Sequence, residues 1–280
     1  MAFVVDRFQP ADLAAGLRLS TQAGWNQVAG DWQRALDLCP ETCLAGRLDG
    51  RIVATGNVAS IGPNIRWIGL ILVDEAVRGR GYGSIMMDRC LELACRSGDE
   101  IVGLDASDLG RPVYLKKGFV DVAPIDRWAG VLSPTGCVDA GRIGIGSIEE
   151  LCALDEEACG VDRSPLLEHM LRDPEGLCFG YHGAKGLEGF TFVLPGRTAP
   201  HVGPIVARDG SVLSELLGRV ARSLGNTPVV VDCLRTPVNA WSLERAGLRM
   251  SRRLTRMTRH RPHPVLMGPK VRAAVSFTWG

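Results

Sequence analysis

The sequence predicts an α/β protein built from two domains in tandem. The chain has 280 residues, which is long for one compact domain and suits two of ordinary size. Stretches with strand periodicity alternate with stretches of helical periodicity, and the second half of the chain repeats the element order of the first. Together these observations favour a duplication, with one domain at residues 1–135 and a second at 141–280.

The first domain is predicted to begin with a strand at residues 3–8 and two helices. Strands follow at 43–48 and 51–59, joined by Asp49-Gly50, a dipeptide typical of tight hairpin turns. The apolar run 67–73 has the nearly unbroken pattern of a strand that is buried on both faces.

A glycine-dense turn leads from that strand into a helix. It reads Arg78-Gly-Arg-Gly-Tyr-Gly83. We expect a strand at 101–106, a short helix at 111–117 and a last strand beginning at Phe119. Strand, helix and strand in this order make a crossover unit on a sheet.

A stretch at residues 130–146, rich in Gly, Pro, Ser and Thr, marks the boundary between the domains. The second domain then repeats the order of two helices, three strands, helix, strand and short helix. The predicted ranges are 147–157 and 164–171 for the helices, 177–181, 189–194 and 202–207 for the strands, then 211–224, 229–233 and 238–246 for the helix, strand and short helix.

Composition excludes several classes of protein. Hydrophobic residues at 46% and charged residues at 22% are typical of a globular chain. A net charge of +1 argues against a chain built mainly to coat nucleic acid. With no apolar run of about 18 residues and no secretory signal, we expect a cytoplasmic protein with no membrane partner. A homodimer stays open.

Nine cysteines are scattered along the chain. They form no CxxC pair and have no histidine near them at ligand spacing. We therefore expect reduced, mostly buried thiols and no metal site.

The turn at 78–83 has the chemistry of an anion cradle. Its three glycines remove side chains where backbone amides must approach a ligand, and the helix it opens presents free N–H groups. Arg78 and Arg80 add charged donors for phosphate oxygens. The spacing differs from the GxGxxG loop of dinucleotide-binding folds, and the Gly-Lys-Ser/Thr of ATPase loops is missing. From this turn alone, a glycine-rich turn without a ligand is the alternative.

A second motif further along the chain favours the ligand-binding turn over a turn without a ligand. It reads Tyr114-Leu-Lys-Lys-Gly-Phe119. With Arg78-Gly-Arg-Gly-Tyr-Gly83 before it, the pattern resembles the GCN5-related N-acetyltransferase (GNAT) superfamily over about residues 1–130. The segments Ala23–Asn26 and Leu104–Ser107 resemble a tandem subgroup with a diverged second copy. The resemblance implies two GNAT domains, each a mixed, mostly antiparallel twisted sheet flanked by helices.

The resemblance implies an N-acetyltransferase that moves an acetyl group from acetyl-CoA to a primary amine of a small molecule or peptide. The alternative is a non-catalytic protein that binds or senses acyl-CoA. In this family a bulged strand, here 69–73, pairs with the pantetheine arm. The implied cofactor-binding residues are Ile71, Leu72, Val73, Arg78, Gly79, Arg80, Gly81, Tyr82, Gly83, Ser84, Ser107 and Lys117. Many relatives carry asparagine where Ser107 stands.

The resemblance also assigns catalytic roles. Tyr114 is the expected acid that protonates the thiolate of CoA. An amine with a pKa of ~10.4 must lose a proton before it attacks. Asp105 and Asp31 are the foremost candidates for the base, with Glu41 and Asp74 behind them.

Acceptor contacts are expected from the helices and loops that vary between relatives. Trp25 and Asn26 are candidate substrate-binding residues, whereas Trp32 is assigned to the core. In the second domain, Asp232 and Trp241 are candidates for acceptor specificity, with helix capping and core packing as the alternative.

The second domain has no counterpart of the glycine turn. The corresponding stretch, 202–211, lacks the motif and contains Pro204, which has no N–H to donate. We therefore expect this domain not to bind CoA. The arginine-rich segment 249–261 is predicted to be a solvated, positively charged last strand. That this segment binds nucleic acid is the less favoured hypothesis.

Overall fold

The structure is a computed structural model that describes residues 2–95, 101–134, 147–184 and 186–280. It is a mixed α/β protein whose strands are mostly antiparallel. The chain divides into two compact units. Unit 1 comprises Met1–Leu104 with Gly196–Thr198 and Trp279, and unit 2 comprises Asp105–Pro195, Ala199–Thr278 and Gly280.

Unit 1 contains a sheet whose strands follow the chain order. The strands are β1 (Phe3–Arg7), β2 (Cys43–Leu48), β3 (Arg51–Ser60), β4 (Ile65–Val73) and the first residues of β5 (Ile101–Ala106). Neighbours from β1 to β4 are antiparallel, and β4 and β5 are parallel. Asp49 and Gly50 both have positive φ, at 48° and 81°, as the turn between β2 and β3 requires.

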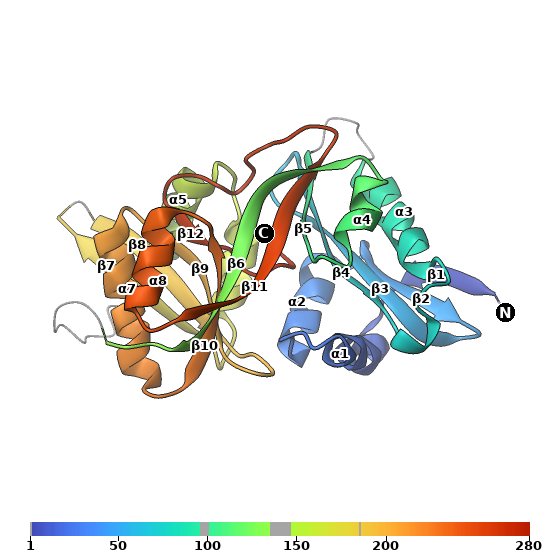
Figure 1. The fold of residues 1–280 in the computed structure, drawn as a ribbon, viewed down its shortest axis with the longest axis horizontal. Coiled ribbons are helices and arrows are strands. Elements are labelled where there is room, and N and C mark those ends of the chain that lie inside the picture. The colour runs from blue at the N-terminus through green and yellow to red at the C-terminus, as the bar shows by residue number, and fades with distance from the viewer. Residues whose placement is uncertain (1, 96–100, 135–146, 185) are drawn as a thin grey trace. The chain divides into compact units, whose positions relative to one another are not determined.

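Helices cover this sheet on two sides (Figure 1). They are the short helices η1 (Pro10–Asp12) and η2 (Glu75–Val77), with α1 (Leu13–Gln22), α2 (Ala29–Leu38) and α3 (Tyr82–Ala94). Trp32 of α2 is fully buried, as predicted. It packs so close to α1 that a Cβ at Gly16 would lie 2.8 Å from its ring. Shape complementarity therefore fixes the packing of α1 on α2.

The strand β4 is bulged within 69–73, where the resemblance implies a bulge. Leu70 has φ of +52°, and the register with β3 shifts between Thr55 and Asn57. The pairing of β4 with β5 covers only Ile65–Trp67 against Ile101–Gly103. A residue in left-handed backbone disrupts a regular ladder. The last part of β4 therefore pairs with β3 alone among the described residues.

Unit 2 contains the remaining strands, in the order β11-β6-β10-β12-β9-β8-β7. The strands are β6 (Phe119–Val131), β7 (Leu177–Gly183), β8 (Gly186–Leu194), β9 (His201–Ala207), β10 (Pro228–Leu234), β11 (Arg249–Arg259) and β12 (Val271–Ala273). The helices are α4 (Arg111–Leu115), α5 (Ile148–Cys159), α6 (Ser164–Leu171), α7 (Gly210–Leu224) and α8 (Pro237–Arg245). No helix in the described parts of the chain is long and apolar enough to cross a membrane.

The core of unit 2 lies between α7 and the sheet. Leu213, Leu216, Leu217 and Val220 form the apolar face of α7 and are at most 1% exposed. Their spacing of three and four residues is the helical pattern that predicted this helix. The buried face therefore fixes α7 on strands β7, β8 and β9.

Strand order in unit 2 does not follow the two repeats of the sequence. β6, which ends the first repeat, pairs with β10 of the second through residues 125–131 and 228–234. Its other neighbour is β11. The compact units therefore divide at Leu104, within β5. The boundary predicted from composition falls largely on residues 135–146, outside the described residues, and stays a prediction.

The prediction of a solvated strand at 249–261 needs a correction. Arg249, Arg252 and Arg253 are exposed, but Arg256 is fully buried. Its guanidinium pairs with Asp105, whose charge makes burial of the arginine tolerable. β11 is also followed by a further strand, β12.

Candidate active site

The glycine turn forms an open cradle at the start of α3. Gly79 and Gly81 have φ of 79° and 85°, a backbone conformation that side chains disfavour. A Cβ built on either glycine would have no atom within 4 Å. Gly81 is the N-cap residue of α3, and it supplies no capping side chain. The turn therefore presents backbone, and space, to a ligand.

Backbone donors at this turn fit an anionic group. The first amides of a helix have no partner inside it and carry partial positive charge. The amides of Ser84 and Ile85 donate to the Gly81 oxygen at 3.0 and 3.1 Å, which leaves the groups before them as the cradle's donors. The Ser84 amide is thus engaged locally, and diphosphate binding by residues 79–83 stays a prediction.

The two arginines of the motif differ in their surroundings. Arg78 turns back toward β4, with Nε donating to the Val73 oxygen at 3.1 Å and Nη1 3.3 Å from Glu75. Arg80 is exposed beside the cradle. In this arrangement Arg78 holds the end of β4 in place, and Arg80 is available to a ligand's charge.

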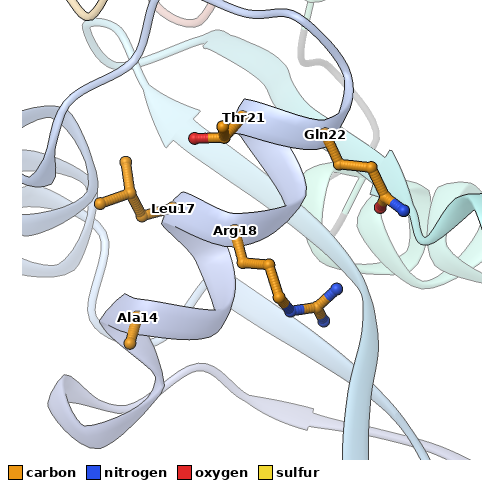
Figure 2. A pocket seen from close by; sticks show the side chains of 5 residues that line it. All are labelled: Ala14, Leu17, Arg18, Thr21 and Gln22. Atoms are coloured by element: carbon orange, nitrogen blue, oxygen red, sulfur yellow. The ribbon is translucent and has the colours of Figure 1, made fainter.

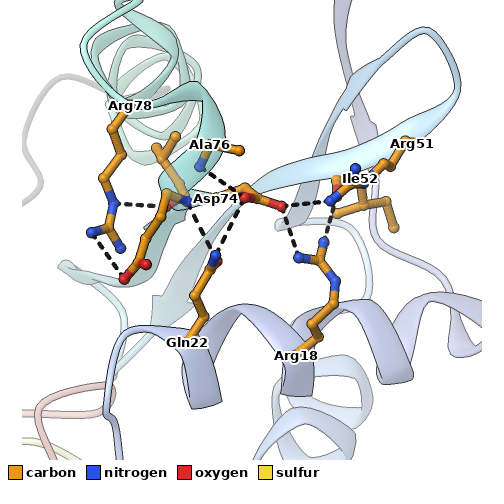
Figure 3. Close-up of polar contacts among 9 residues, drawn as sticks. Arg18, Gln22, Arg51, Ile52, Asp74, Ala76 and Arg78 are labelled. Carbon is orange, nitrogen blue, oxygen red and sulfur yellow. Dashed lines mark hydrogen bonds and ion pairs between the residues drawn. The ribbon is translucent and has the colours of Figure 1, made fainter.

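Asp74 connects the cradle to α1. This carboxylate is 2% exposed and follows β4 directly. Its oxygens accept from Arg18 at 2.8 Å, Arg51 at 3.0 Å and Gln22 at 3.4 Å, and from the Ala76 amide at 3.1 Å (Figure 3). Burial alone would raise the pKa of Asp74, but the donors around it lower that pKa below the ordinary value.

An open depression of about 570 Å³ lies along α1. Figure 2 shows the five side chains that line it. They are Ala14, Leu17, Arg18, Thr21 and Gln22. Arg18 and Gln22 also bind Asp74. The same face of α1 therefore lines the depression and contacts the residue that connects β4 to the cradle.

The predicted acceptor residues Trp25 and Asn26 lie between α1 and α2, both half-buried. Residues 197–198, distant in sequence, bind them within unit 1. Arg197 Nε donates to the Trp25 oxygen at 2.8 Å, and the amide and hydroxyl of Thr198 donate to Asn26 Oδ1 at 2.8 and 2.6 Å. The Asn26 side chain is therefore committed to holding this loop, and substrate contact by Trp25 and Asn26 stays a prediction.

The carboxylates predicted as the general base have partners of their own. Asp31 accepts from the Val28 amide and from Arg34 Nη1, both at 2.9 Å, at the start of α2. Asp105 makes a two-bond ion pair with Arg256, and both side chains are at most 1% exposed. Burial raises the pKa of Asp105 and Arg256 opposes that rise. Each carboxylate thus has a structural role, and the base stays unassigned by geometry.

Tyr114 belongs to α4, in unit 2. Its half-buried ring packs on Gly110, where a Cβ would lie 2.8 Å from a ring carbon, and is tilted against Phe119 at 6.1 Å. The Ser107 hydroxyl accepts from the Gly110 amide at 3.2 Å, and the Lys117 oxygen accepts from Arg259. Glycine at 110 therefore makes room for the Tyr114 ring, and the roles of Tyr114, Ser107 and Lys117 stay predictions.

The two candidates of the second domain have different environments. Asp232 is fully buried and is bound by Arg127 through two 2.7 Å bonds and by His201 at 3.1 Å. Burial would raise the pKa of Asp232, but these partners lower it to about 2. Trp241 is 57% exposed, with Arg245 4.9 Å from its ring. The arrangement favours the alternative of a structural core role for Asp232, and the structure adds that this role is a buried ion pair.

Several hydrogen-bond and ion-pair partners of the site residues could not be predicted from the sequence. Arg18 and Gln22 are four residues apart on one helix, so the sequence predicts that they share a face. It does not predict that both side chains donate to Asp74. Thr198 is 172 residues from Asn26 and carries no motif. The partners of Asp105 and Asp232 are similarly remote, because sheet pairing brings them together.

Comparisons with known proteins agree on one family. The model described as "Acetyltransferase (GNAT) family" matches residues 16–119, and the one described as "Acetyltransferase (GNAT) domain" matches 151–267. The holothin acyltransferase of Pseudoalteromonas sp. (strain SANK 73390) is 24% identical over 212 residues. The match spans 74% of this chain and 71% of that protein.

Solved structures share the fold. A Pyrococcus horikoshii protein described as an acetyltransferase superposes with a TM-score of 0.83 at 21% identity, over 99% of this chain and 96% of that one. A GCN5-related N-acetyltransferase from Sphaerobacter thermophilus gives 0.63 at 18% identity, over 93% and 96%. At such identities the likeness concerns the fold alone.

Proposed function

Because the chain belongs to the GNAT acetyltransferase family, with two family domains in tandem, we propose that it is an acetyl-CoA-dependent N-acetyltransferase. The observation that carries the proposal is the uncapped start of α3, with glycines of positive φ and open space in front of them. A helix start of this kind binds the phosphates of a nucleotide. The match at 16–119 covers this turn.

In this proposal the amides at 79–83 bind the diphosphate of CoA, and Arg80 adds a charge-assisted bond. The backbone of Ile71, Leu72 and Val73, at the end of β4 that has left β5, is available to pair with an extended chain. When bound, acetyl-CoA supplies the activated acyl group as a thioester. The residues of this chain then orient that group and transfer two protons, one from the acceptor amine and one to the sulfur of CoA.

The first proton leaves the acceptor amine, which attacks only in its neutral form. Since Asp31 and Asp105 hold arginines, water is an alternative proton acceptor that leaves both ion pairs intact. The second proton goes to the sulfur of CoA, and we assign it to the hydroxyl of Tyr114. A phenol with a pKa of ~10 retains its proton at neutral pH until the thiolate forms.

The acceptor is proposed to be a primary amine of a small molecule or peptide. The name of one relative gives holothin as its substrate. The depression along α1 and the loop at Trp25 and Asn26 are the proposed places for acceptor contacts, because loops held by a rigid scaffold often carry binding residues. An amine panel therefore decides the class of acceptor.

The experiment compares substitutions at two glycines with similar φ, 81° at Gly50 and 85° at Gly81. Gly81→Asp adds a carboxylate in the cradle, whereas Gly50→Asp adds the same group at a hairpin turn, also at positive φ and with no atom within 4 Å. We expect Gly81→Asp to weaken acetyl-CoA binding by at least about tenfold, or 1.4 kcal/mol. Gly50→Asp should bind normally. Titration calorimetry measures binding, and release of free thiol with an amine panel measures turnover.

Each outcome bears on the proposal. Normal acetyl-CoA affinity in Gly81→Asp would contradict the cradle. Tight binding by the wild-type chain without thiol release from any amine would support a sensing protein instead. Loss of binding in Gly81→Asp, with amine-dependent thiol release by the wild type and by Gly50→Asp, supports the acetyltransferase.

A further inference from the structure

The second repeat contains the same three elements that carry the cradle in the first. β9, α7 and β10 follow one another as strand, helix and parallel strand, as do β4, α3 and β5. In both repeats the two parallel strands pair only at their beginning. β9 and β10 are paired at His201 and Val230 alone.

The two repeats differ in what lies beyond that pairing. In unit 2 the strand β12, formed by Val271–Ala273, lies between β9 and β10. Ala273 pairs with Cys233 of β10 on one side and with Ile205 of β9 on the other, both antiparallel. A segment of the chain thus occupies the opening between the parallel strands.

Backbone hydrogen bonds hold this segment at both ends. The Ala274 amide donates to the backbone carbonyl oxygen of Asp232 at 2.8 Å, and the Ala207 amide donates to the backbone carbonyl oxygen of Lys270 at 2.9 Å. These two bonds satisfy one group on each of the parallel strands, which would otherwise be buried without a partner. The segment therefore completes the ladder from β9 to β10.

The strand β9 is shaped for this occupant. A Cβ on Gly203 would overlap the Ala274 oxygen, so only glycine lets the segment approach. Ala273 is 0% exposed and belongs to the core cluster with Ile205 and Cys233. The contact is therefore part of the folded core of unit 2.

The start of α7 is filled as well, in contrast to that of α3. Asp209 caps the helix, with Oδ1 accepting from the amides of Ser211 and Val212 at 2.9 and 3.1 Å. Arg272 of β12 donates to the oxygens of Ala207 and Arg208 at 3.1 and 3.2 Å. A carboxylate of the chain thus takes the place that an anion would take at an uncapped helix.

We propose that the opening between β9 and β10 is a site for an extended peptide strand and that β12 is its permanent occupant. Unit 2 then has no room for a pantetheine arm. Peptide segments bind sheet edges through main-chain hydrogen bonds. A tethered segment competes at an effective concentration in the millimolar range, so micromolar acyl-CoA of similar intrinsic affinity does not displace it. The consequence for acyl-CoA rests on the proposed function, whereas the occupancy by β12 does not.

Hydrogen exchange on the full-length chain tests the occupancy. We expect the amides of residues 271–274 to exchange as slowly as those of β9 and β10. Saturating acetyl-CoA should change their rates by less than about twofold, because the ligand does not displace the occupant. Exchange at the rate of an unprotected peptide, or faster exchange on addition of acetyl-CoA, would overturn the proposal.

A variant pair tests the fit of Gly203. Gly203→Ala should speed exchange at 271–274 by at least about tenfold, because its methyl group overlaps the Ala274 oxygen. Gly210→Ala, whose methyl group would lie 3.0 Å from a methyl of Val238 and 4.0 Å from the Ser242 hydroxyl, is the control. Unchanged exchange in Gly203→Ala would overturn the fit. If Gly203→Ala does not fold, exchange in the wild type still decides.

Binding stoichiometry separates this proposal from the function. One acetyl-CoA per wild-type chain, bound more weakly in Gly81→Asp, supports both. Two per chain would overturn the occupancy by β12, whereas one bound with unchanged affinity in Gly81→Asp would contradict the cradle and leave the role of β12 to the exchange data. No binding by the wild type contradicts the proposed function, while the exchange data still decide the role of β12.

Discussion

Replacing Arg256 by methionine is expected to cost a large part of the stability of unit 2. The guanidinium binds both oxygens of Asp105, at 2.9 and 3.0 Å, and also donates to the oxygens of Val265 and Leu266. Both charged side chains are at most 1% exposed. Removing one partner of such a pair leaves a buried charge and costs about 3–5 kcal/mol. Folded domains have about 5–15 kcal/mol in total.

Urea unfolding followed by circular dichroism measures this loss, with hydrogen exchange of β11 identifying the unit that opens. The double variant Asp105→Leu with Arg256→Met removes both charges and should recover most of the lost free energy of unfolding. Burial already raises the pKa of Asp105 above its unfolded value, and in Arg256→Met alone that pKa rises further because the opposing charge is gone. The penalty is therefore complete above the folded pKa and shrinks as the pH falls toward the unfolded one. A loss below about 1 kcal/mol would refute this reasoning.

The same double variant tests the predicted role of Asp105 as general base. If the carboxylate only balances Arg256, the folded double variant should still release thiol from acetyl-CoA. A fall in turnover of about 10²–10⁴-fold, without loss of folded protein, would make Asp105 the base.

Further predictions concern the carboxylates of Asp74 and Asp232 and the phenol of Tyr114. Asp74→Ala should cost about 1–2 kcal/mol of stability, because it removes the cap on the Ala76 amide, and should raise the Kd for acetyl-CoA in calorimetry; an unchanged Kd would separate Asp74 from the cradle. The folded pKa of Asp232, about 2, lies below the unfolded value. Its contribution is therefore present above about pH 4 and lost as the pH falls through 2, worth about 2 kcal/mol. Urea midpoints that do not change between pH 5 and pH 2 would contradict it. Tyr114→Phe should lower turnover with nearly unchanged acetyl-CoA affinity, and equal turnover at every pH would remove its role as acid.

Local chemistry made much of the fold predictable. Asp49-Gly50 specifies a turn in which both residues need positive φ, and the structure has that turn. The spacing of apolar residues in α7 predicted its buried face. The glycines at 79 and 81 predicted an open helix start, and Gly81 is the uncapped N-cap of α3. In each case the signal lies within a few residues of the feature.

Long-range pairing was not predictable from local signals. β12 follows an arginine-rich strand and has only three residues, too short for a periodic pattern. β6 pairs with β10, an exchange between the repeats that the order of elements does not reveal. Asp105 is a carboxylate on a strand in the sequence, but its partner Arg256 lies 151 residues away. These features depend on which strands become neighbours in the folded sheet.

Amide chemical shifts test the cradle most directly. In a ¹⁵N-labelled chain, saturation with CoA should shift the backbone amides of residues 79–83, and pantetheine, which lacks the diphosphate, should leave them unchanged. Amide signals at 79–83 that stay fixed in saturating CoA, or that respond equally to pantetheine, would contradict diphosphate binding by this turn.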